Sequence, residues 1–269
     1  MKTLIKKNKC IRILEAHSAL SAKIVEEAGF DGIWLGSLCD SAIRCLPDIE
    51  LVSLDDRIQT INQIRNITDI PIIIDCDTGT SVERMPYWIK SLENAKVNAI
   101  VIEDKTGNKR NSLDEKATHK LEDVDSFCDK IKAGKSESIM LIARLESLIA
   151  KKSMYNALLR AEAYIEAGVD GIMIHSKQSV GEEVLDFAKA FRKKWKDVPL
   201  MCVPTTYNFI YDKRLEEVGF NIICHANHLL RASMLAMRQT AEKIYKNGRT
   251  KDLKIASVDD IFKITNYVK

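Results

Sequence analysis

Three acidic side chains stand at the ends of two consecutive apolar segments of the chain. Asp75 and Asp77 follow the first segment, and Glu103 ends the second. If both segments are parallel strands, their carboxyl ends meet at one edge and crowd three negative charges into a small volume. A bound cation would relieve that repulsion. Oxygen ligands without paired histidines or cysteines favour Mg²⁺, with Mn²⁺ as the alternative, over zinc. The simpler alternative is that these carboxylates cap helices or pair with Arg144.

Two later apolar segments end on groups that bind anions. Arg144 ends one of them, and His175 ends the next along the chain. A guanidinium group can bind a carboxylate or a phosphoryl group through two hydrogen bonds, and a histidine adds a further donor. These residue types indicate a site for a small anion beside the carboxylates. For His17 and His225, packing near the rim of the fold is the alternative to a functional role.

The segments that carry these groups belong to a pattern that runs along the whole chain. Short β-branched runs alternate with amphipathic helical stretches, and no low-complexity linker interrupts them. The predicted strands are 11–16, 32–35, 71–75, 99–103, 139–144, 171–175, 200–204 and 221–225, and the predicted helices include 21–29, 54–67, 83–96, 124–134, 154–168, 182–195 and 212–219. Eight such units favour parallel strands covered by helices in a closed (β/α)₈ TIM-type barrel. We expect one domain over residues 1–269.

Two segments lie outside this alternation. Residues 105–119 are polar, long for a loop and contain a glycine, which is typical of a mobile lid, although an ordinary solvated loop is the alternative. After the last strand, C-terminal helices occupy about 229–269. They comprise a long helix over about 229–247 and a short one near 258–266.

The composition excludes several classes of partner. Lysine and arginine number 41, aspartate and glutamate number 38, and the basic residues are scattered, so we expect no nucleic-acid partner. No apolar stretch is long enough to span a bilayer, and the basic N-terminus lacks the apolar segment of a signal peptide. We therefore expect no membrane partner and a cytoplasmic location. The seven cysteines form no CxxC pair, which favours reduced thiols packed in the core.

The segment that begins at Glu103 carries a recognisable motif. Residues 103–112, EDKTGNKRNS, resemble the EDKxxxKxNS signature of the phosphoenolpyruvate mutases in the isocitrate lyase superfamily. Residues 15–17, 75–79, 142–144, 173–176, 204–205 and 226–228 are similar to other motifs of that family, so the resemblance covers nearly the whole chain. Two positions depart from it. Gly36 stands where many relatives have a substrate-binding serine, and residues 106–108 differ from the Phe-Pro form of some mutases.

The resemblance implies an isomerase that interconverts phosphoenolpyruvate and phosphonopyruvate, a step of phosphonate biosynthesis that makes a carbon–phosphorus bond. It also implies a Mg²⁺ site of four carboxylates. Asp75 would bind the metal directly, whereas Asp48, Asp77 and Glu103 would hold metal-bound waters.

The resemblance also assigns the groups around the substrate. Arg144, His175 and Asn111 would hold the phosphoryl group, and Lys109 would arrive with the lid. Further substrate contacts would come from the segment after the second strand and from the lid, through Trp34, Gly36, Ser37, Leu38 and Ser112. Relatives of this kind form homo-oligomers, dimers or tetramers, in which the last barrel helix, here about 229–247, is exchanged between chains.

Three alternatives share this barrel. A phosphonopyruvate hydrolase would admit water, but a threonine replaces the lid asparagine in that branch, whereas this chain has Asn111. A C–C lyase similar to methylisocitrate lyase would carry a cysteine in the lid, and residues 105–112 contain none. A binding or regulatory barrel without catalysis would not need the complete set of matched metal and phosphoryl residues, which argues against it.

Overall fold

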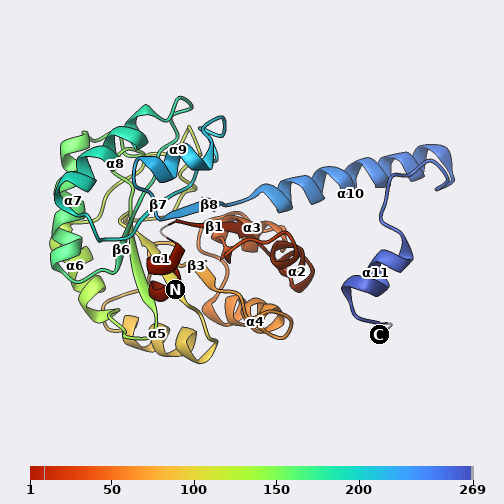
Figure 1. Cartoon of the computed structure of the whole chain (residues 1–269), viewed down its shortest axis with the longest axis horizontal. Helices are drawn as coiled ribbons and strands as arrows, with labels where there is room; N and C mark the ends of the chain where they lie inside the picture. Colours follow the sequence, from red (N-terminus) through yellow and green to blue (C-terminus); the bar gives the residue numbers. More distant parts are fainter. Residues whose placement is uncertain (9, 268–269) are drawn as a thin grey trace. The chain divides into compact units, whose positions relative to one another are not determined.

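Residues 1–8 and 10–267 are described by a computed structural model, in which eight parallel strands close into a barrel (Figure 1). The strands pair in chain order, and Ile11 of the first strand pairs with Ile222 of the last. The strands are β1 (Ile11–Glu15), β2 (Gly32–Leu35), β3 (Ile72–Asp75), β4 (Ala99–Glu103), β5 (Met140–Leu145), β6 (Gly171–Ile174), β7 (Leu200–Cys202) and β8 (Ile222–His225). The (β/α)₈ prediction is confirmed, with strand ends that differ by no more than about two residues.

The strands are apolar on both sides because each one separates the barrel interior from the surrounding helices. β3 reads Ile-Ile-Ile-Asp, and all four residues are buried. A single cluster fills the interior and takes residues from every strand, among them Ile13, Trp34, Ile73, Val101, Ile142, Met173, Met201 and Cys224. Because side chains fill the interior, a small molecule can bind only at an end of the barrel.

Helices cover the outside of the strands (Figure 1). They are α2 (Ala19–Glu27), α4 (Leu54–Arg65), α5 (Met85–Asn94), α6 (Val124–Ala133), α7 (Met154–Glu166), α8 (Glu182–Lys194) and α9 (Asp212–Glu217). A serine or aspartate side chain caps the first turn of α2, α4, α6 and α7. On α8 the buried residues Val184, Phe187, Ala188 and Phe191 recur at helical spacing, which gives the helix one apolar face towards the barrel.

Two short helices were not predicted. α1 (Lys2–Asn8) precedes β1, and its Ile5 belongs to the interior cluster, so this helix closes the amino end of the barrel. α3 (Ser37–Ala42) follows β2 directly after Gly36. Six residues are too few to show a helical period in the sequence.

Residues from His228 onward form a second compact unit, separate from the unit Met1–Asn227. It contains α10 (His228–Asn247) and α11 (Val258–Ile264), close to the predicted bounds of both helices. The single-domain assignment stays a prediction. No helix of the described residues combines the length and the apolar character needed to cross a membrane.

We expect the barrel interior to supply much of the stability. Ile73→Ala should lower the free energy of unfolding by about 2–5 kcal/mol, because Ile73 is fully buried and its truncation leaves a cavity. Ile67→Ala is the matched control, since Ile67 is 40% exposed and should lose about 1 kcal/mol or less. Urea unfolding followed by circular dichroism measures both. Equal losses in the two variants would contradict this assignment of the core.

Candidate active site

A pocket lies at the carboxyl ends of the strands, where sequence analysis places the site. Asp75 ends β3, Glu103 ends β4, Arg144 lies in β5 one residue before its end, and His175 follows β6. The pocket is lined by every predicted site residue except Asp77, namely Trp34, Gly36, Ser37, Leu38, Asp48, Asp75, Glu103, Lys109, Asn111, Ser112, Arg144 and His175. The structure therefore brings the predicted residues together, and Asp77 contacts Lys109 beside them.

His17 and His225, for which the sequence leaves a functional role open, do not line the pocket. His17 contacts the buried Glu15, and His225 lies 3.3 Å from Asp212 Oδ2. Both contacts agree with the packing alternative.

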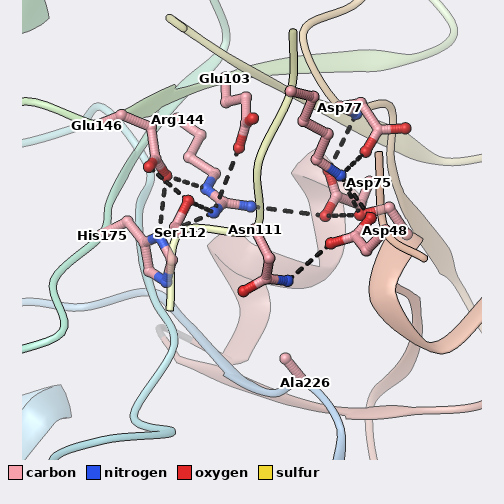
Figure 2. A network of polar contacts seen from close by, with 12 residues as sticks. Asp48, Asp75, Asp77, Glu103, Asn111, Ser112, Arg144, Glu146, His175 and Ala226 are labelled. Carbon is pink, nitrogen blue, oxygen red and sulfur yellow. Dashed lines mark hydrogen bonds and ion pairs between the residues drawn. The ribbon is translucent and has the colours of Figure 1, made fainter. Parts of the chain in front are cut away.

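The carboxylates Asp48, Asp75 and Asp77 gather on one side of the site (Figure 2), and the ammonium group of Lys109 lies among them. Lys109 Nζ donates to Asp48 Oδ1 at 2.7 Å and forms an ion pair with Asp77. It also donates at 2.9 Å to Ser37 Oγ, which in turn donates to Asp75 Oδ2 at 3.1 Å. Burial alone would lower the pKa of Lys109, but Asp77 and Asp75 raise it, so the lysine is charged.

Arg57 also contacts two of these acidic residues, although the sequence indicated no role for it. This arginine lies on α4, is 4% exposed and donates to the backbone oxygen of Asp75 and the carboxylate of Asp77. Burial would raise the pKa of Asp77, but Lys109 and Arg57 lower it overall. The signal in the sequence was a charged residue on the buried face of a helix, at helical spacing from Ile61 and Ile64.

Glu103 has the least complete set of partners among the carboxylates. It is 1% exposed, and no described residue donates a hydrogen bond to either of its oxygens. Lys105 Nζ lies 3.1 Å and Arg144 Nη2 lies 3.3 Å from them as ion pairs. Burial raises the pKa of Glu103 to about 7, against the lowering effect of Arg144. Buried oxygens without donors fit a place for a hard cation.

Asp48, Asp75, Asp77 and Glu103 could therefore hold a divalent cation. Their donor set contains only oxygen, as Mg²⁺ and Mn²⁺ prefer. Within the part of the chain that the structure describes, no three acidic, histidine or cysteine side chains are grouped as metal ligands. The Lys109 ammonium lies between Asp48 and Asp77, so ligation by these two residues would require Nζ to move aside.

Arg144 joins the carboxylates to a second set of polar groups (Figure 2). Its Nη1 lies 3.5 Å from Asp75 Oδ2, whereas its Nη2 donates to Ser112 Oγ at 2.9 Å and lies 2.8 Å from His175 Nδ1. Burial and the nearby Arg144 lower the pKa of His175. The arrangement places a fixed cation, a histidine and a hydroxyl group together at one wall of the pocket.

Glu146 lies behind that wall and is a further residue to which sequence analysis assigned no role. Its carboxylate is fully buried and contacts Arg144 Nε at 2.5 Å, Ser112 Oγ at 2.6 Å and His175 Nδ1 at 2.8 Å. A glutamate two residues after an arginine at a strand end gave the only sequence signal. Two of its partners, Ser112 and His175, come from distant segments and could not be predicted.

Four residues of the predicted lid segment 105–119 line the pocket, namely Lys109, Asn111, Ser112 and Leu113. Lys109 and Asn111 both contact Asp48, and Asn111 Nδ2 donates to Asp48 Oδ2 at 2.7 Å. Lys105 Nζ donates to the backbone oxygen of Arg110 and to Ser112 Oγ, both at 2.9 Å, and so ties the start of the segment to its middle. Opening of this segment stays a prediction.

Gly36 departs from the pattern of many relatives, and the structure gives a physical reason. A Cβ atom at this position would lie 2.5 Å from Trp34 Nε1, closer than atoms can approach. The tryptophan ring therefore fills the space that a side chain at position 36 would need. The adjacent Ser37 carries the hydroxyl group that contacts Asp75 and Lys109.

Comparison with known proteins agrees with this site. A family model described as phosphoenolpyruvate phosphomutase matches residues 1–245. A phosphoenolpyruvate phosphomutase of Tetrahymena pyriformis is 35% identical, over 98% of this chain and 89% of that protein.

Two solved structures extend the comparison. A phosphoenolpyruvate phosphomutase from Streptomyces platensis subsp. rosaceus has a TM-score of 0.94 at 34% identity and covers 99% of this chain and 94% of its own. A phosphonopyruvate hydrolase in complex with oxalate and Mg²⁺ has a TM-score of 0.89 at 32% identity. The match covers 99% of this chain and 93% of the hydrolase chain. The family match spans the barrel and every residue of the pocket, so the chain belongs to the phosphoenolpyruvate phosphomutase family.

Proposed function

We propose that the chain is an isomerase that interconverts phosphoenolpyruvate and 3-phosphonopyruvate. The observation that carries the proposal is the position of Arg144 between two kinds of group. On one side it contacts the carboxylates Asp75 and Glu103, and on the other it contacts His175 and Ser112. A small molecule could place an enolate oxygen near the carboxylates and a phosphoryl group near His175 and Ser112, and would then contact both sets of groups.

The reaction breaks the bond between phosphorus and the enolate oxygen and forms a bond between phosphorus and the methylene carbon of the same molecule. A loose, metaphosphate-like transition state asks mainly for positioning and for stabilisation of charge. Arg144 supplies a fixed positive charge, and His175 and Asn111 supply donors to the moving phosphoryl group. None of these groups needs to form a covalent bond to the substrate.

Water must be excluded, because it would capture the phosphoryl group and release pyruvate and phosphate. Lys109 and Asn111 close the pocket over Asp48, and both side chains come from the lid segment. Trp34, Gly36, Ser37 and Leu38 also line the pocket. The proposal assigns the lid the task of keeping the moving group away from solvent.

We expect the reaction to need Mg²⁺, with Mn²⁺ as the alternative. Asp75 would be the direct ligand, and Asp48, Asp77 and Glu103 would hold metal-bound waters. The buried oxygens of Glu103 without hydrogen-bond donors support this assignment, as does the Mg²⁺ bound by the similar hydrolase. When bound, the cation would stabilise negative charge on the enolate oxygen.

Phosphonopyruvate hydrolysis is the second candidate, because a hydrolase shares the fold at nearly the same identity as the mutase. The lid asparagine argues for the mutase, since Asn111 contacts Asp48 and leaves no hydroxyl group at that position. A C–C lyase is less favoured, because the lid residues 105–112 contain no cysteine.

Assembly into a dimer or tetramer is also a proposal. None of the described residues of α10 is buried, and Met234, Leu235 and Met237 expose between 50% and 63% of their surface. A helix with exposed apolar side chains suits exchange between two chains, as the family resemblance implies. A cytoplasmic location and a role in phosphonate biosynthesis likewise stay predictions.

The proposed reaction is tested by incubating the protein with phosphonopyruvate and Mg²⁺ and following the phosphorus compounds by ³¹P NMR. We expect phosphoenolpyruvate to appear, and Asp75→Ala to lower the rate by about 10³-fold or more because the carboxylate site is broken. Asp125→Ala, an exposed position on α6, should retain full activity. Circular dichroism of each variant checks folding.

If inorganic phosphate forms and phosphoenolpyruvate does not, the protein is a hydrolase and the mutase proposal is wrong. An unchanged spectrum with the folded wild-type protein would contradict both.

The position of Lys109 predicts competition with the cation. Lys109→Met should bind Mn²⁺ about tenfold more tightly or better, because the ammonium that contacts Asp48 and Asp77 is lost. The same variant should melt at a lower temperature in a chelating buffer, because the buried carboxylates lose a partner. Electron paramagnetic resonance measures free Mn²⁺, and Lys116→Met, an exposed lid position, is the control. Weaker Mn²⁺ binding by Lys109→Met would refute competition.

The raised pKa of Glu103 predicts a pH dependence of stability. Folding raises this pKa from an ordinary 4.5 to about 7, so the protonated form is favoured in the folded protein. Its contribution to stability is complete below about pH 4.5 and is lost as the pH rises through 7. In a chelating buffer, the melting temperature of the wild type should therefore fall more between pH 5 and pH 8 than that of Glu103→Gln. The exposed Glu137→Gln is the control. Parallel curves for wild type and Glu103→Gln would count against this pKa.

A further inference from the structure

We propose that Glu146 is a positioning residue that orients Arg144 and His175 for the phosphoryl group and links that orientation to the lid through Ser112. This inference rests on the proposed function, because it concerns the same phosphoryl site. Glu146 does not line the pocket, so it would act only through the residues that it contacts.

The carboxylate of Glu146 contacts polar groups from three separate segments. Oε1 accepts a hydrogen bond from Arg144 Nε at 2.5 Å, on β5, and lies 2.8 Å from His175 Nδ1, after β6. Oε2 accepts from Ser112 Oγ at 2.6 Å, in the lid segment, and lies 3.6 Å from Lys105 Nζ. One oxygen thus contacts Arg144 and His175, and the other contacts the lid residues. Figure 2 shows Arg144, His175 and Ser112 around Glu146.

The contact with Arg144 sets the direction of the guanidinium group. With Nε bound to Glu146, Nη1 lies towards Asp75 and Nη2 lies towards Ser112 and Glu103. A planar guanidinium held at Nε has little freedom to rotate. The Nη donors are therefore already aimed before a substrate enters, which is the condition for efficient charge stabilisation.

The contact with His175 fixes the imidazole in the same way. Nδ1 lies 2.8 Å from both Glu146 Oε1 and Arg144 Nη2. A carboxylate can only accept a hydrogen bond and a guanidinium can only donate one, so the two neighbours favour opposite protonation states of Nδ1. The charge on Glu146 therefore influences which ring nitrogen carries the proton, and hence what Nε2 can offer to a phosphoryl oxygen.

Glu146 itself has a rigid support. Its backbone N–H donates to Asp104 Oδ1 at 2.8 Å, and Asp104 Oδ2 accepts from Arg160 Nη1 at 3.1 Å and from Tyr164 OH at 2.9 Å. Asp104 and Glu146 are fully buried, and Arg160 and Tyr164 belong to α7. Burial would raise the pKa of Glu146, but Arg144 and His175 hold it well below its usual range, so the carboxylate is ionised.

The lid completes this arrangement. Ser112 Oγ donates to Glu146 and accepts from Arg144 Nη2 and Lys105 Nζ, both at 2.9 Å. If the lid segment moves away, Glu146 Oε2 and Arg144 Nη2 each lose a partner. The lid conformation and the orientation of the phosphoryl-binding groups are therefore linked through one hydroxyl group and one carboxylate.

The test compares Glu146→Gln with wild type by three measurements. The first is the set of ¹⁵N chemical shifts of the His175 ring, which are identified as the signals missing from the spectrum of His175→Gln. The second is hydrogen exchange of residues 105–119, and the third is kcat and KM for phosphonopyruvate. We expect altered His175 shifts, about tenfold faster exchange of the lid segment, and a kcat lowered about 10²-fold with a smaller change in KM. Asp170→Asn is the control, because Asp170 accepts a hydrogen bond from Leu141 N at the other end of the same strands.

Two further variants keep the test decisive. If Glu146→Gln does not fold, Ser112→Ala serves, and it should speed exchange of the lid segment and change the His175 shifts, because the hydroxyl group that links them is lost. Glu146→Asp should restore part of the wild-type His175 shifts, because it keeps the charge. Unchanged His175 shifts and unchanged lid exchange in Glu146→Gln would overturn the proposal. The first two measurements need no turnover, so they decide the role of Glu146 even if the chain proves not to be a mutase.

Discussion

The site depends on one electrostatic constraint, the burial of several carboxylates at one end of a closed barrel. Asp75, Asp77 and Glu103 are each 5% exposed or less, and removing an ion from water costs several kcal/mol even after the protein relaxes. These carboxylates can be kept there only if positive charge surrounds them. The neighbouring cations are therefore part of the fold as much as of the chemistry.

That positive charge comes from three directions. Arg57 approaches from a surrounding helix, Arg144 from a barrel strand and Lys109 from the lid segment. The two arginines are held by elements of the barrel, whereas the lysine belongs to a loop. If the loop opens as predicted, the cation most easily exchanged for a metal ion would be the one on the lid.

The strands and the site residues at their ends could be predicted from the sequence because both leave a local signal. A β-branched run such as Ile72–Asp75 ends on the carboxylate that it positions, so element and function lie side by side in the chain. Arg57 and Glu146 could not be predicted in this way. Arg57 contacts Asp75 and Asp77, 18 and 20 residues away, and Glu146 contacts His175 and Ser112, 29 and 34 residues away, so only closure of the barrel brings these groups together. The short helices α1 and α3 also escaped prediction, because neither spans enough turns to show a period.

The fold alone does not select one reaction, because a mutase and a hydrolase share it with TM-scores of 0.94 and 0.89. Both reactions break a bond between phosphorus and the rest of the substrate, and they differ in whether the phosphoryl group then bonds to another atom of the same molecule or to water. In this chain Asp48 binds both Lys109 and Asn111, so one carboxylate of the proposed metal site also holds the lid in place. A cation that displaces Lys109 would leave Asn111 as the remaining contact between the lid and Asp48. The choice between transfer to carbon and transfer to water would then depend on how firmly that single amide keeps the pocket closed.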